Sequence, residues 1–303
     1  MNKYLIAVVG ATAIGKTALS IQLAKHFQAE IISCDSRQFY KEMEIGTAVP
    51  NNEELAAAQH HFIQNRSIFD NYSVGDFEKD AISQLNELFK TSNVVIMVGG
   101  SGLYANAVID GLDYFPEVSP TIRAELNSRI KNGELAQLQE QLKQLDVESY
   151  QTIEIENPHR LIRALEICIG TGKPYASFKN KNKQLRNFTT IKVGLTAPRE
   201  IMYQRINQRV DIMMQQGLLE EAKKLAPHKN LNALQTVGYK ELFQYFNGEI
   251  TLDVAVEEIK KNTRRFAKRQ VTWNKKDTAI HWFNFEDDTA DIIKKITALL
   301  HVA

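Results

Sequence analysis

The sequence has few cysteines, no excess of one charge and no long apolar run. Its two cysteines, Cys34 and Cys168, form no Cys-x-x-Cys pair and cannot by themselves build a zinc site or a disulfide framework, which is typical of a reducing compartment. The apolar run at residues 5–9 is too short for the core of a signal peptide, and no stretch of about 18 apolar residues occurs in the chain. We therefore expect a cytoplasmic protein with no membrane segment.

The balance of charge excludes proteins that attract a polyanion through the field of the whole molecule. Lys and Arg number 37 and Asp and Glu number 36, which gives a formal net charge of +1. A polyanionic partner would therefore have to meet a local basic surface. Nothing in the sequence resembles a coiled-coil seam, so we expect a monomer.

One glycine-containing stretch, GATAIGKT, fits the phosphate-binding spacing G-x-x-x-x-G-K-[ST] and lies between an apolar run and a helical pattern. In such a loop the backbone N–H groups surround a phosphate, Lys16 reaches its outer oxygens and the Thr17 hydroxyl binds Mg²⁺. The alternative is a turn that only joins a strand to a helix. The residues predicted to bind the phosphate are Gly10, Ala11, Thr12, Ala13, Ile14, Gly15, Lys16 and Thr17.

A parallel sheet covered by helices is predicted by the alternation of apolar runs with helical patterns. The runs that favour strands are residues 5–9, 30–33, 94–98 and 189–197. Residues 121–183 are rich in Gln, Glu and Lys, with leucines at helical spacing, and the pattern from Glu200 onward is helical. We expect an α/β fold, with a P-loop NTPase-like parallel sheet flanked by helices in residues 1–115 and 188–303 and an all-helical insertion in residues 116–187.

The third apolar run lacks the carboxylate that a P-loop ATPase normally places at its end to hold Mg²⁺. It continues instead as VGGSGLY, whose glycines suggest a close backbone approach to an anion, with the Ser101 hydroxyl as a further donor. A tight turn would explain the glycines and leave Ser101 without a role. The loop therefore predicts a bound phosphate, but it does not predict that this phosphate is hydrolysed.

The second apolar run leads into SCDSRQFY, which places Asp35 at the carboxyl edge of the sheet, where open α/β sheets bind ligands. Asp35 either faces the phosphate's chemical partner or caps the following helix through its side-chain oxygen. The amide of Gln38 has the donor and acceptor that can pair with a base edge. Arg205 and Arg209 are four residues apart on one helical face and form either a phosphate clamp or a solvated stripe.

Basic residues are concentrated late in the chain, at residues 259–276. This stretch, IKKNTRRFAKRQVTWNKK, has eight Lys and Arg residues and no acidic residue, with Phe266 and Trp273 between them. Such a composition is typical of a surface that follows a nucleic-acid backbone and offers stacking faces. A solvated helix face is the alternative.

Together these residues make the sequence resemble the tRNA dimethylallyltransferase (tRNA isopentenyltransferase, IPP transferase) family. The segments that carry the resemblance are GATAIGKT, DSRQFY, IGTAVP, YSVGDF, VGGSGLY, NPHRLIRALEI, TGKP, RVDIMMQQGL, VGYKELFQYFNG and TRRFAKRQVTW, in the family's order over nearly the whole chain. The resemblance implies transfer of a dimethylallyl group from dimethylallyl diphosphate to N6 of the adenosine immediately 3′ of the anticodon in tRNA, with release of diphosphate.

The resemblance also implies roles for individual residues. Asp35 would be the general base, and the developing charge on the diphosphate would be stabilised by Lys16, Thr17 with Mg²⁺, Ser101 and Arg209. The implied tRNA contacts are Asp35, Ser36, Arg37, Gln38, Ser101, Arg123, His159, Arg160, Leu161, Ile162, Arg163, Gln235, Thr236, Val237, Gly238, Tyr239, Lys240, Lys268, Arg269, Gln270, Thr272 and Trp273.

The sequence departs from the family pattern at a few positions. Ala11 and Ile14 stand where Pro and Ser are expected, and neither change removes an essential donor. Gln64 replaces the usual Asp, and Asn274 stands where an aromatic residue is common. We therefore assign no catalytic role to the segment around Gln64 and no base stacking to Asn274.

Three other functions compete with this interpretation. A small-molecule kinase would hold ATP on the loop, but the missing carboxylate and the basic stretch count against it. An adenylate isopentenyltransferase would prenylate free AMP, which leaves the insertion and the basic stretch without a purpose. A non-catalytic RNA-binding module leaves the phosphate-binding loop and Asp35 unused.

Overall fold

The computed structural model describes residues 2–179 and 184–302, so that a short part of the predicted insertion lies outside the described residues. The chain forms two compact units, one from Met1–Asp110 with Leu185–Ala303 and one from Gly111–Gln184. Each unit has its own hydrophobic core. We describe the two units separately, and the division predicted from the sequence, with an insertion that contacts tRNA, stays a prediction.

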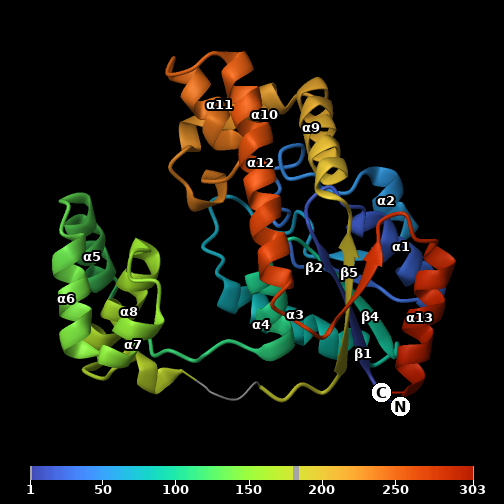
Figure 1. The fold of residues 1–303 in the computed structure, drawn as a ribbon, viewed down its shortest axis with the longest axis horizontal. Helices are drawn as coiled ribbons and strands as arrows, with labels where there is room; N and C mark the ends of the chain where they lie inside the picture. The colour runs from blue at the N-terminus through green and yellow to red at the C-terminus, as the bar shows by residue number, and fades with distance from the viewer. Residues whose placement is uncertain (1, 180–183, 303) are drawn as a thin grey trace. The chain divides into compact units, whose positions relative to one another are not determined.

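The larger unit is built on a parallel sheet (Figure 1). Its described residues form six strands in the order β3-β2-β4-β1-β5-β6, and every neighbouring pair is parallel. The strands are β1 (Tyr4–Gly10), β2 (Ile31–Ser33), β3 (His60–His61), β4 (Val94–Val98), β5 (Thr189–Thr196) and β6 (Ile280–Asn284). In the centre, Ile6 of β1 is in register with Ile96 of β4 and Ile191 of β5.

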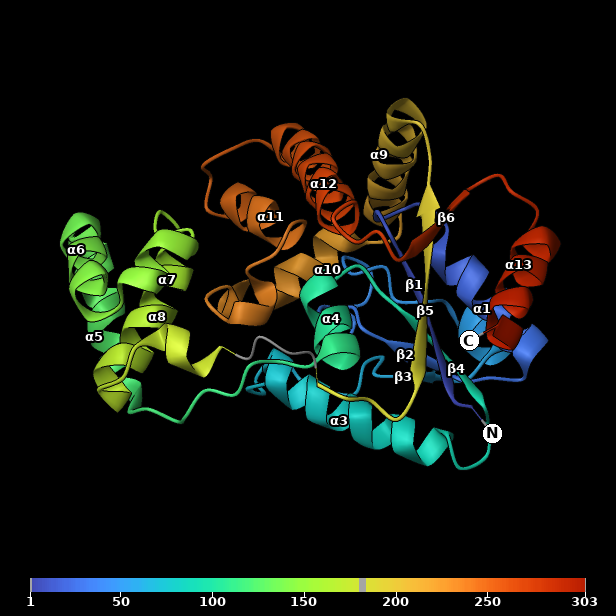
Figure 2. The same ribbon diagram turned by 60° about the horizontal axis from the view of Figure 1, so that its bottom comes forward.

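Helices cover both faces of this sheet (Figure 2). α1 and α13 pack on one face, and α3 and α4 pack on the other. The helices of the unit are α1 (Lys16–Phe27), α2 (Asn52–Ala57), α3 (Val74–Leu88), α4 (Gly102–Asp110), α9 (Arg199–Gln215), α10 (Leu218–Leu225), α11 (Tyr239–Phe246), α12 (Leu252–Asn274) and α13 (Thr289–Val302), with short 3₁₀ turns at Ala226–His228 and Asn232–Leu234. Because both faces are covered, the inner strands are apolar throughout, as the sequence showed.

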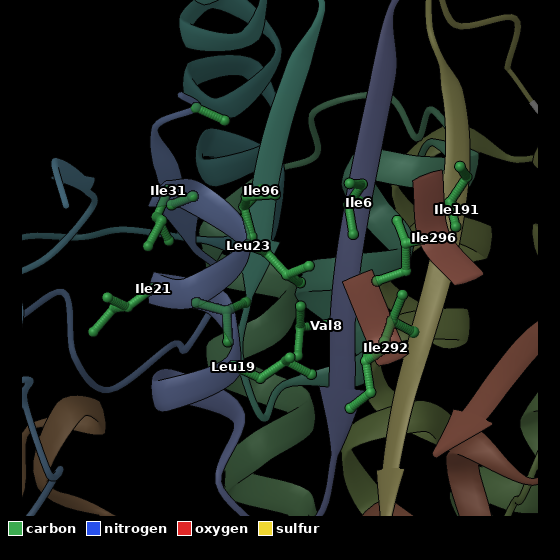
Figure 3. Packing of buried hydrophobic residues seen from close by; sticks show 14 of the residues in the cluster. Ile6, Val8, Leu19, Ile21, Leu23, Ile31, Ile96, Ile191, Ile292 and Ile296 are labelled. Atoms are coloured by element: carbon green, nitrogen blue, oxygen red, sulfur yellow. The ribbon is translucent and has the colours of Figure 1, made fainter. Parts of the chain in front are cut away.

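The alternation of side chains along β1 explains how one strand serves two cores. Ile6 and Val8 point to the face covered by α1 and α13, where they meet Leu23 and Ile292 (Figure 3). Leu5 and Ala7 point to the other face. Leu23 is fully buried, and burial of a leucine side chain contributes roughly 1.5–3 kcal/mol to folding.

Two further clusters position the elements at the carboxyl edge of the sheet. α10, α11 and α12 pack together around Tyr239 and Leu242. Ala11 and Ala13 of the phosphate-binding loop pack against Ile206 of α9 and Ala267 of α12. The loop is therefore held between the sheet and two long helices.

The smaller unit is helical in its described residues. It contains α5 (Pro120–Lys131), α6 (Leu135–Leu145), α7 (Val147–Thr152), α8 (Pro158–Thr171) and a 3₁₀ turn at Tyr175–Phe178. Leu126, Leu138, Leu142 and Leu165 form its core. Asn157 caps α8 by accepting a hydrogen bond from the His159 N–H at 3.1 Å, and Pro158 occupies the first turn, where its missing donor costs nothing.

The four predicted strands are confirmed, with ends that differ by one residue or none. The prediction of a purely helical chain after Glu200 is wrong, because residues 280–284 form the edge strand β6. In β6 Ile280 and Phe283 are buried and Trp282 is exposed, so the segment shows no simple alternation. The two-residue strand β3 is too short for any periodicity. No described helix is long and apolar enough to span a membrane.

Candidate functional site

Two cavities meet at the carboxyl edge of the sheet in the larger unit. The first, here called the P-loop cavity, has a volume of about 670 Å³ and is lined by residues 12–18, Arg205 and neighbouring side chains. The second, here called the α12 cavity, has a volume of about 480 Å³ and is lined by Ser101, Phe266, Arg269 and neighbouring side chains. The residues that line both are Thr12, Asp35, Thr47, Ala48, Gly100, Arg209 and Met213.

The P-loop cavity has the backbone geometry of a phosphate site. Gly10, Ala13 and Gly15 adopt positive φ angles of 142°, 63° and 111°, which curl the chain before α1 begins at Lys16. A Cβ atom at Gly10 would lie 2.8 Å from the Leu195 carbonyl oxygen, so only glycine fits there. The first N–H groups of α1 have no acceptor within the helix, and such a helix N-terminus favours an anion.

Three cations belong to this cavity. The Lys16 ammonium donates to the Ala11 carbonyl oxygen at 2.7 Å, and the Arg205 guanidinium donates to the Ala13 carbonyl oxygen at 2.8 Å. Arg209 lies 3.4 Å from the Thr12 hydroxyl. Arg209 is half-buried and Arg205 is exposed, and the predicted phosphate clamp stays a prediction.

Burial lowers the pKa of Lys16 to about 8; Asp35 opposes that shift and Arg209 adds to it. Burial also lowers the pKa of Arg209, and Arg205 adds to the effect, although a guanidinium stays protonated. Lys16 and Arg209 thus lie in a poorly solvated place, where Asp35 and Glu54 offset only part of the cost of their charge. A ligand with several negative charges would relieve that cost.

Asp35 lies where the two cavities join. Its Oδ1 atom accepts a hydrogen bond from the Arg37 N–H at 3.1 Å, which fixes the turn after β2. A Cβ atom at Gly100 would lie 3.3 Å from its Oδ2 atom, which therefore faces the glycine loop after β4. The helix that the capping interpretation expected does not follow β2, so Oδ1 fixes a turn instead, and the role of Asp35 toward a substrate stays a prediction. The adjacent thiol of Cys34 stays protonated, since burial raises its pKa to about 12.

The glycines after β4 allow side chains from other elements to approach the backbone closely. The Ser101 hydroxyl hydrogen-bonds the Ser36 hydroxyl at 3.0 Å and so joins this loop to the Asp35 turn. A Cβ atom at Gly102 would lie 2.4 Å from the Trp273 indole nitrogen, and one at Gly100 would lie 2.6 Å from the Gln270 amide nitrogen. Side chains of α12 thus lie against Gly100 and Gly102, and the anion predicted at these glycines stays a prediction.

Gln270 connects α12 to both glycine-containing loops. Its Oε1 atom accepts a hydrogen bond from the Thr12 N–H, and its Nε2 atom donates to the Gly100 carbonyl oxygen, both at 2.8 Å. The side chain is only 7% exposed. Gln270 therefore acts inside the protein in this structure, and its predicted contact with tRNA stays a prediction.

The basic stretch of α12 divides into two halves. In the first half Lys260 pairs with Asp211 at 2.8 Å, Lys261 pairs with Glu258 at 2.7 Å, and Arg264 donates to Asn207 at 2.6 Å. In the second half Lys268 and Arg269 are exposed, and Arg269 borders the α12 cavity. Most charges of the first half are thus held by neighbouring side chains, with the exception of the exposed Arg265, whereas Lys268 and Arg269 are open to solvent.

Other predicted tRNA contacts of the larger unit differ in their surroundings. Thr236, Val237 and Gly238 line the α12 cavity, and Gln235, Lys240 and Thr272 are exposed. The Arg37 guanidinium donates to the carbonyl oxygens of Asn232 and Ala233, and the Gln38 amide donates to those of Thr47 and Ala48. Tyr239 is fully buried, backbone included, so its predicted contact with tRNA stays a prediction.

The smaller unit holds the remaining predicted contacts. Arg123 and Arg163 both pair with the buried carboxylate of Glu166, with 2.6 Å between Arg123 Nη2 and Glu166 Oε1. Burial raises the pKa of Glu166, but the hydrogen bonds from Arg123 and Arg163 outweigh burial and hold that pKa below its ordinary value. His159 and Arg160 are exposed, whereas Leu161 and Ile162 belong to the core. The charged residues form a surface that an RNA backbone can contact.

Sequence reasoning missed the residues between the cavities. Thr47 and Ala48 line both cavities. They belong to the segment IGTAVP, which was noted only as part of the family resemblance and was given no role of its own. Met213 also lines both cavities, and nothing in its helical spacing distinguishes it from a core methionine.

Comparison with known proteins identifies the family. A family model described as IPP transferase matches residues 38–277. The chain is 60% identical over 300 residues to a tRNA dimethylallyltransferase of Flavobacterium johnsoniae, with 97% of each chain covered, and 59% identical to that of Christiangramia forsetii, with 99% and 100% covered. The chain belongs to the IPP transferase family.

Solved structures of IPP transferases have the same fold. The full-length tRNA isopentenylpyrophosphate transferase of Bacillus halodurans matches with a TM-score of 0.73 and 36% identity over 99% of this chain and 96% of the other. A eukaryotic dimethylallyltransferase acting on tRNA matches with a TM-score of 0.80 and 26% identity over 94% of this chain and 75% of the other. The predicted α/β fold, a parallel sheet flanked by helices, is thereby confirmed as that of the family, and the sheet has six strands in the described residues.

Proposed function

We propose that the protein transfers the dimethylallyl group of dimethylallyl diphosphate to N6 of the adenosine immediately 3′ of the anticodon in tRNA. The tRNA dimethylallyltransferase activity itself follows from the close similarity to relatives of that name over nearly the whole chain. The position of the modified base, the identity of the donor and the roles of individual residues are our proposal.

The observation that supports it is the junction of two cavities at Asp35. The P-loop cavity has curled N–H groups and the cations Lys16, Arg205 and Arg209, which suit a diphosphate. The α12 cavity opens among Ser101, Trp273 and the exposed Arg269, which suit a flipped base attached to an RNA backbone. Donor and acceptor would therefore enter different cavities and meet where these join.

In the reaction the allylic carbon–oxygen bond of the donor breaks and a bond from that carbon to N6 forms. Negative charge grows on the departing diphosphate, where Lys16, Arg209 and the loop N–H groups stabilise it. The exocyclic amine is a weak nucleophile because its lone pair is delocalised into the ring. Asp35 would accept its proton as the new bond forms, and the Oδ2 atom near Gly100 is the oxygen that borders both cavities.

The donor set fits a magnesium ion that arrives with the diphosphate. The hydroxyl of Thr17 lies in the P-loop cavity, and Mg²⁺ prefers such oxygen ligands together with substrate phosphates and water. No group of three or more His, Cys, Asp or Glu in the described part of the chain is arranged to hold a metal ion alone. Thr17 would hold the ion, which would supply further positive charge to the leaving group.

The contacts with tRNA would extend beyond the flipped base. Lys268 and Arg269 of α12 are exposed, as are His159 and Arg160 of the smaller unit. These charges are placed on surfaces, which suits contacts with the backbone of an anticodon stem-loop. We also infer that the protein works as a cytoplasmic monomer.

A single-turnover assay tests this proposal. Purified protein, Mg²⁺ and labelled dimethylallyl diphosphate are mixed with an anticodon stem-loop RNA, and parallel reactions contain AMP or ATP as the second substrate. We expect label in the RNA alone. Label in AMP would show an adenylate isopentenyltransferase, and phosphate released from ATP would show a kinase; either result would overturn the proposal.

A further inference from the structure

A short loop forms part of the boundary between the two cavities. We call residues 44–48, between β2 and α2, the Gly46 loop. Its residues Thr47 and Ala48 line both the P-loop cavity and the α12 cavity, next to Asp35 and Arg209. Whatever fixes this loop therefore fixes the place where donor and acceptor meet.

One carboxylate holds the first part of this loop. Glu221, on α10, accepts hydrogen bonds from the N–H groups of Glu44 at 3.1 Å, Ile45 at 2.8 Å and Gly46 at 2.9 Å. The Tyr239 hydroxyl, on α11, donates to the same carboxylate at 2.7 Å. Four donors on one carboxylate form a strong, charge-assisted set of hydrogen bonds.

The other part of the loop is held from the Asp35 turn. The Gln38 amide nitrogen donates to the carbonyl oxygens of Thr47 at 3.2 Å and Ala48 at 2.8 Å. Ala48 has a φ of 53°, in the left-handed region that a residue with a side chain rarely adopts. Such a conformation persists only where its partners impose it. The Gly46 loop is thus fixed at both ends by side chains from other elements.

Tyr239 also packs directly against the loop. A Cβ atom at Gly46 would lie 2.6 Å from the Tyr239 ring, so the ring and the glycine are in close contact. The ring is fully buried, and burial raises the pKa of Tyr239, with Glu221 adding to the effect. The hydroxyl therefore remains a donor to Glu221 at every working pH.

The chemistry of the proposed reaction gives this rigid boundary a purpose. As the allylic carbon–oxygen bond lengthens, any nucleophile that reaches the carbon can complete the reaction. Attack by water would form a carbon–oxygen bond, give dimethylallyl alcohol and diphosphate, and pass a proton to the solvent. A loop that seals the junction keeps water out and leaves the RNA amine as the nucleophile.

We propose that Glu221, supported by Tyr239, is a positioning residue that holds the Gly46 loop as a partition and so couples donor cleavage to RNA prenylation. The inference rests on the proposed function, since it needs a reactive allyl donor and an RNA acceptor. Glu221 itself touches neither substrate and lines neither cavity.

Two variants loosen the partition in different ways. Glu221→Gln places an amide N–H group opposite backbone N–H groups, so at least one loop hydrogen bond is lost. Tyr239→Phe removes one hydroxyl and keeps the ring on Gly46. We expect the molar ratio of diphosphate released to RNA prenylated to rise from about one in the wild type to severalfold above one in Glu221→Gln, and by less in Tyr239→Phe. RNA affinity should remain unchanged in Glu221→Gln.

Glu42→Gln is the matched control. Glu42 lies in the same segment, accepts from the Ser67 hydroxyl at 2.6 Å and the Ile68 N–H at 3.0 Å, and lines neither cavity. Replacing Glu42 removes a similar set of hydrogen bonds without touching the Gly46 loop. The ratio of diphosphate released to RNA prenylated should therefore stay near one in Glu42→Gln. A variant that is merely less stable loses both products together and leaves the ratio unchanged.

The outcomes separate the two claims. A wild type that prenylates no RNA overturns the proposed function and, with it, the premise of the partition. A coupled wild type with equally coupled Glu221→Gln and Tyr239→Phe variants overturns the partition alone. An equal rise in Glu42→Gln also overturns it. Tyr239→Phe retains its packing, so it decides the matter if Glu221→Gln does not fold.

Discussion

The P-loop cavity and the α12 cavity are built in different ways. The first takes its longest continuous stretch of lining, residues 12–18, from the phosphate-binding loop and the start of α1, although other segments also contribute. The second combines residues near Asp35, Ser101, Arg209 and Gly238 with one face of α12. The chemistry of the leaving group is thus encoded locally, whereas the acceptor site exists only after the chain has folded. Variants on the two sides should therefore affect different steps.

The largest effect is expected at Asp35, which belongs to both cavities. Asp35→Ala should lower the single-turnover rate by roughly 10²–10⁴-fold, the usual contribution of a general base, because no other carboxylate lines both cavities. Affinity for an anticodon stem-loop, measured by filter binding, should change little. Equal losses of rate and RNA affinity would show that Asp35 serves binding and not proton transfer.

A somewhat smaller effect is expected at Arg209, on the P-loop side of the junction. Arg209→Ala should lower the transfer rate by roughly 10²–10³-fold, because a donor that stabilises developing charge is lost. Arg205→Ala should cost less, since Arg205 donates to the Ala13 carbonyl oxygen and supports the loop. Single-turnover rates at saturating donor measure both. A larger loss in Arg205→Ala would reverse these roles.

The two halves of α12 allow a test of the acceptor side. Replacing Lys268 and Arg269 together with alanine should make the salt dependence of tRNA binding shallower by roughly two units, because two phosphate contacts are lost. Replacing Lys260 and Lys261 together with alanine removes the same amount of positive charge. Because these lysines pair with Asp211 and Glu258, this change should leave the salt dependence of tRNA binding unchanged. Affinities measured from low to high salt decide this. Equal slopes in both double variants would remove α12 from the interface.

The smallest effect is a pH dependence confined to the donor side. Burial lowers the pKa of Lys16 to about 8 in the free protein, and a bound diphosphate favours the charged form and raises that pKa again. Donor affinity should be full below pH 8 and should fall as the pH rises above 8, by at most about tenfold per pH unit. Titration calorimetry with diphosphate measures it. Lys16→Arg stays charged and should show no such decline; a decline in both proteins would assign it to another group.

The sequence predicted those parts of the molecule that depend on residues close together in the chain. The strands, the phosphate-binding loop and the position of Asp35 follow from apolar periodicity and local spacing. The basic stretch was also visible, but Lys260 and Lys268 are equivalent in the sequence, and only the packing of α9 against α12 pairs one of them with Asp211. Local patterns therefore locate charges without saying which of them are free.

Other features depend on residues far apart in the chain and left no local signal. Glu221 lies in an ordinary helical pattern, and nothing near it indicates that it binds the backbone of residues 44–46. The edge strand β6 has an irregular burial pattern, and Gln270 is one polar residue within a basic helix. Such contacts are set by the tertiary structure, which periodicity does not describe.

The buried amide of Gln270 has a consequence for how the two substrates influence one another. It makes α12 part of the cradle around Thr12, so an RNA that shifts the helix also shifts an N–H group of the loop that would bind diphosphate. Coupling between two sites is reciprocal: if bound RNA changes donor affinity by some factor, bound donor must change RNA affinity by the same factor. A single glutamine would thereby couple the binding of the two substrates without a separate regulatory site.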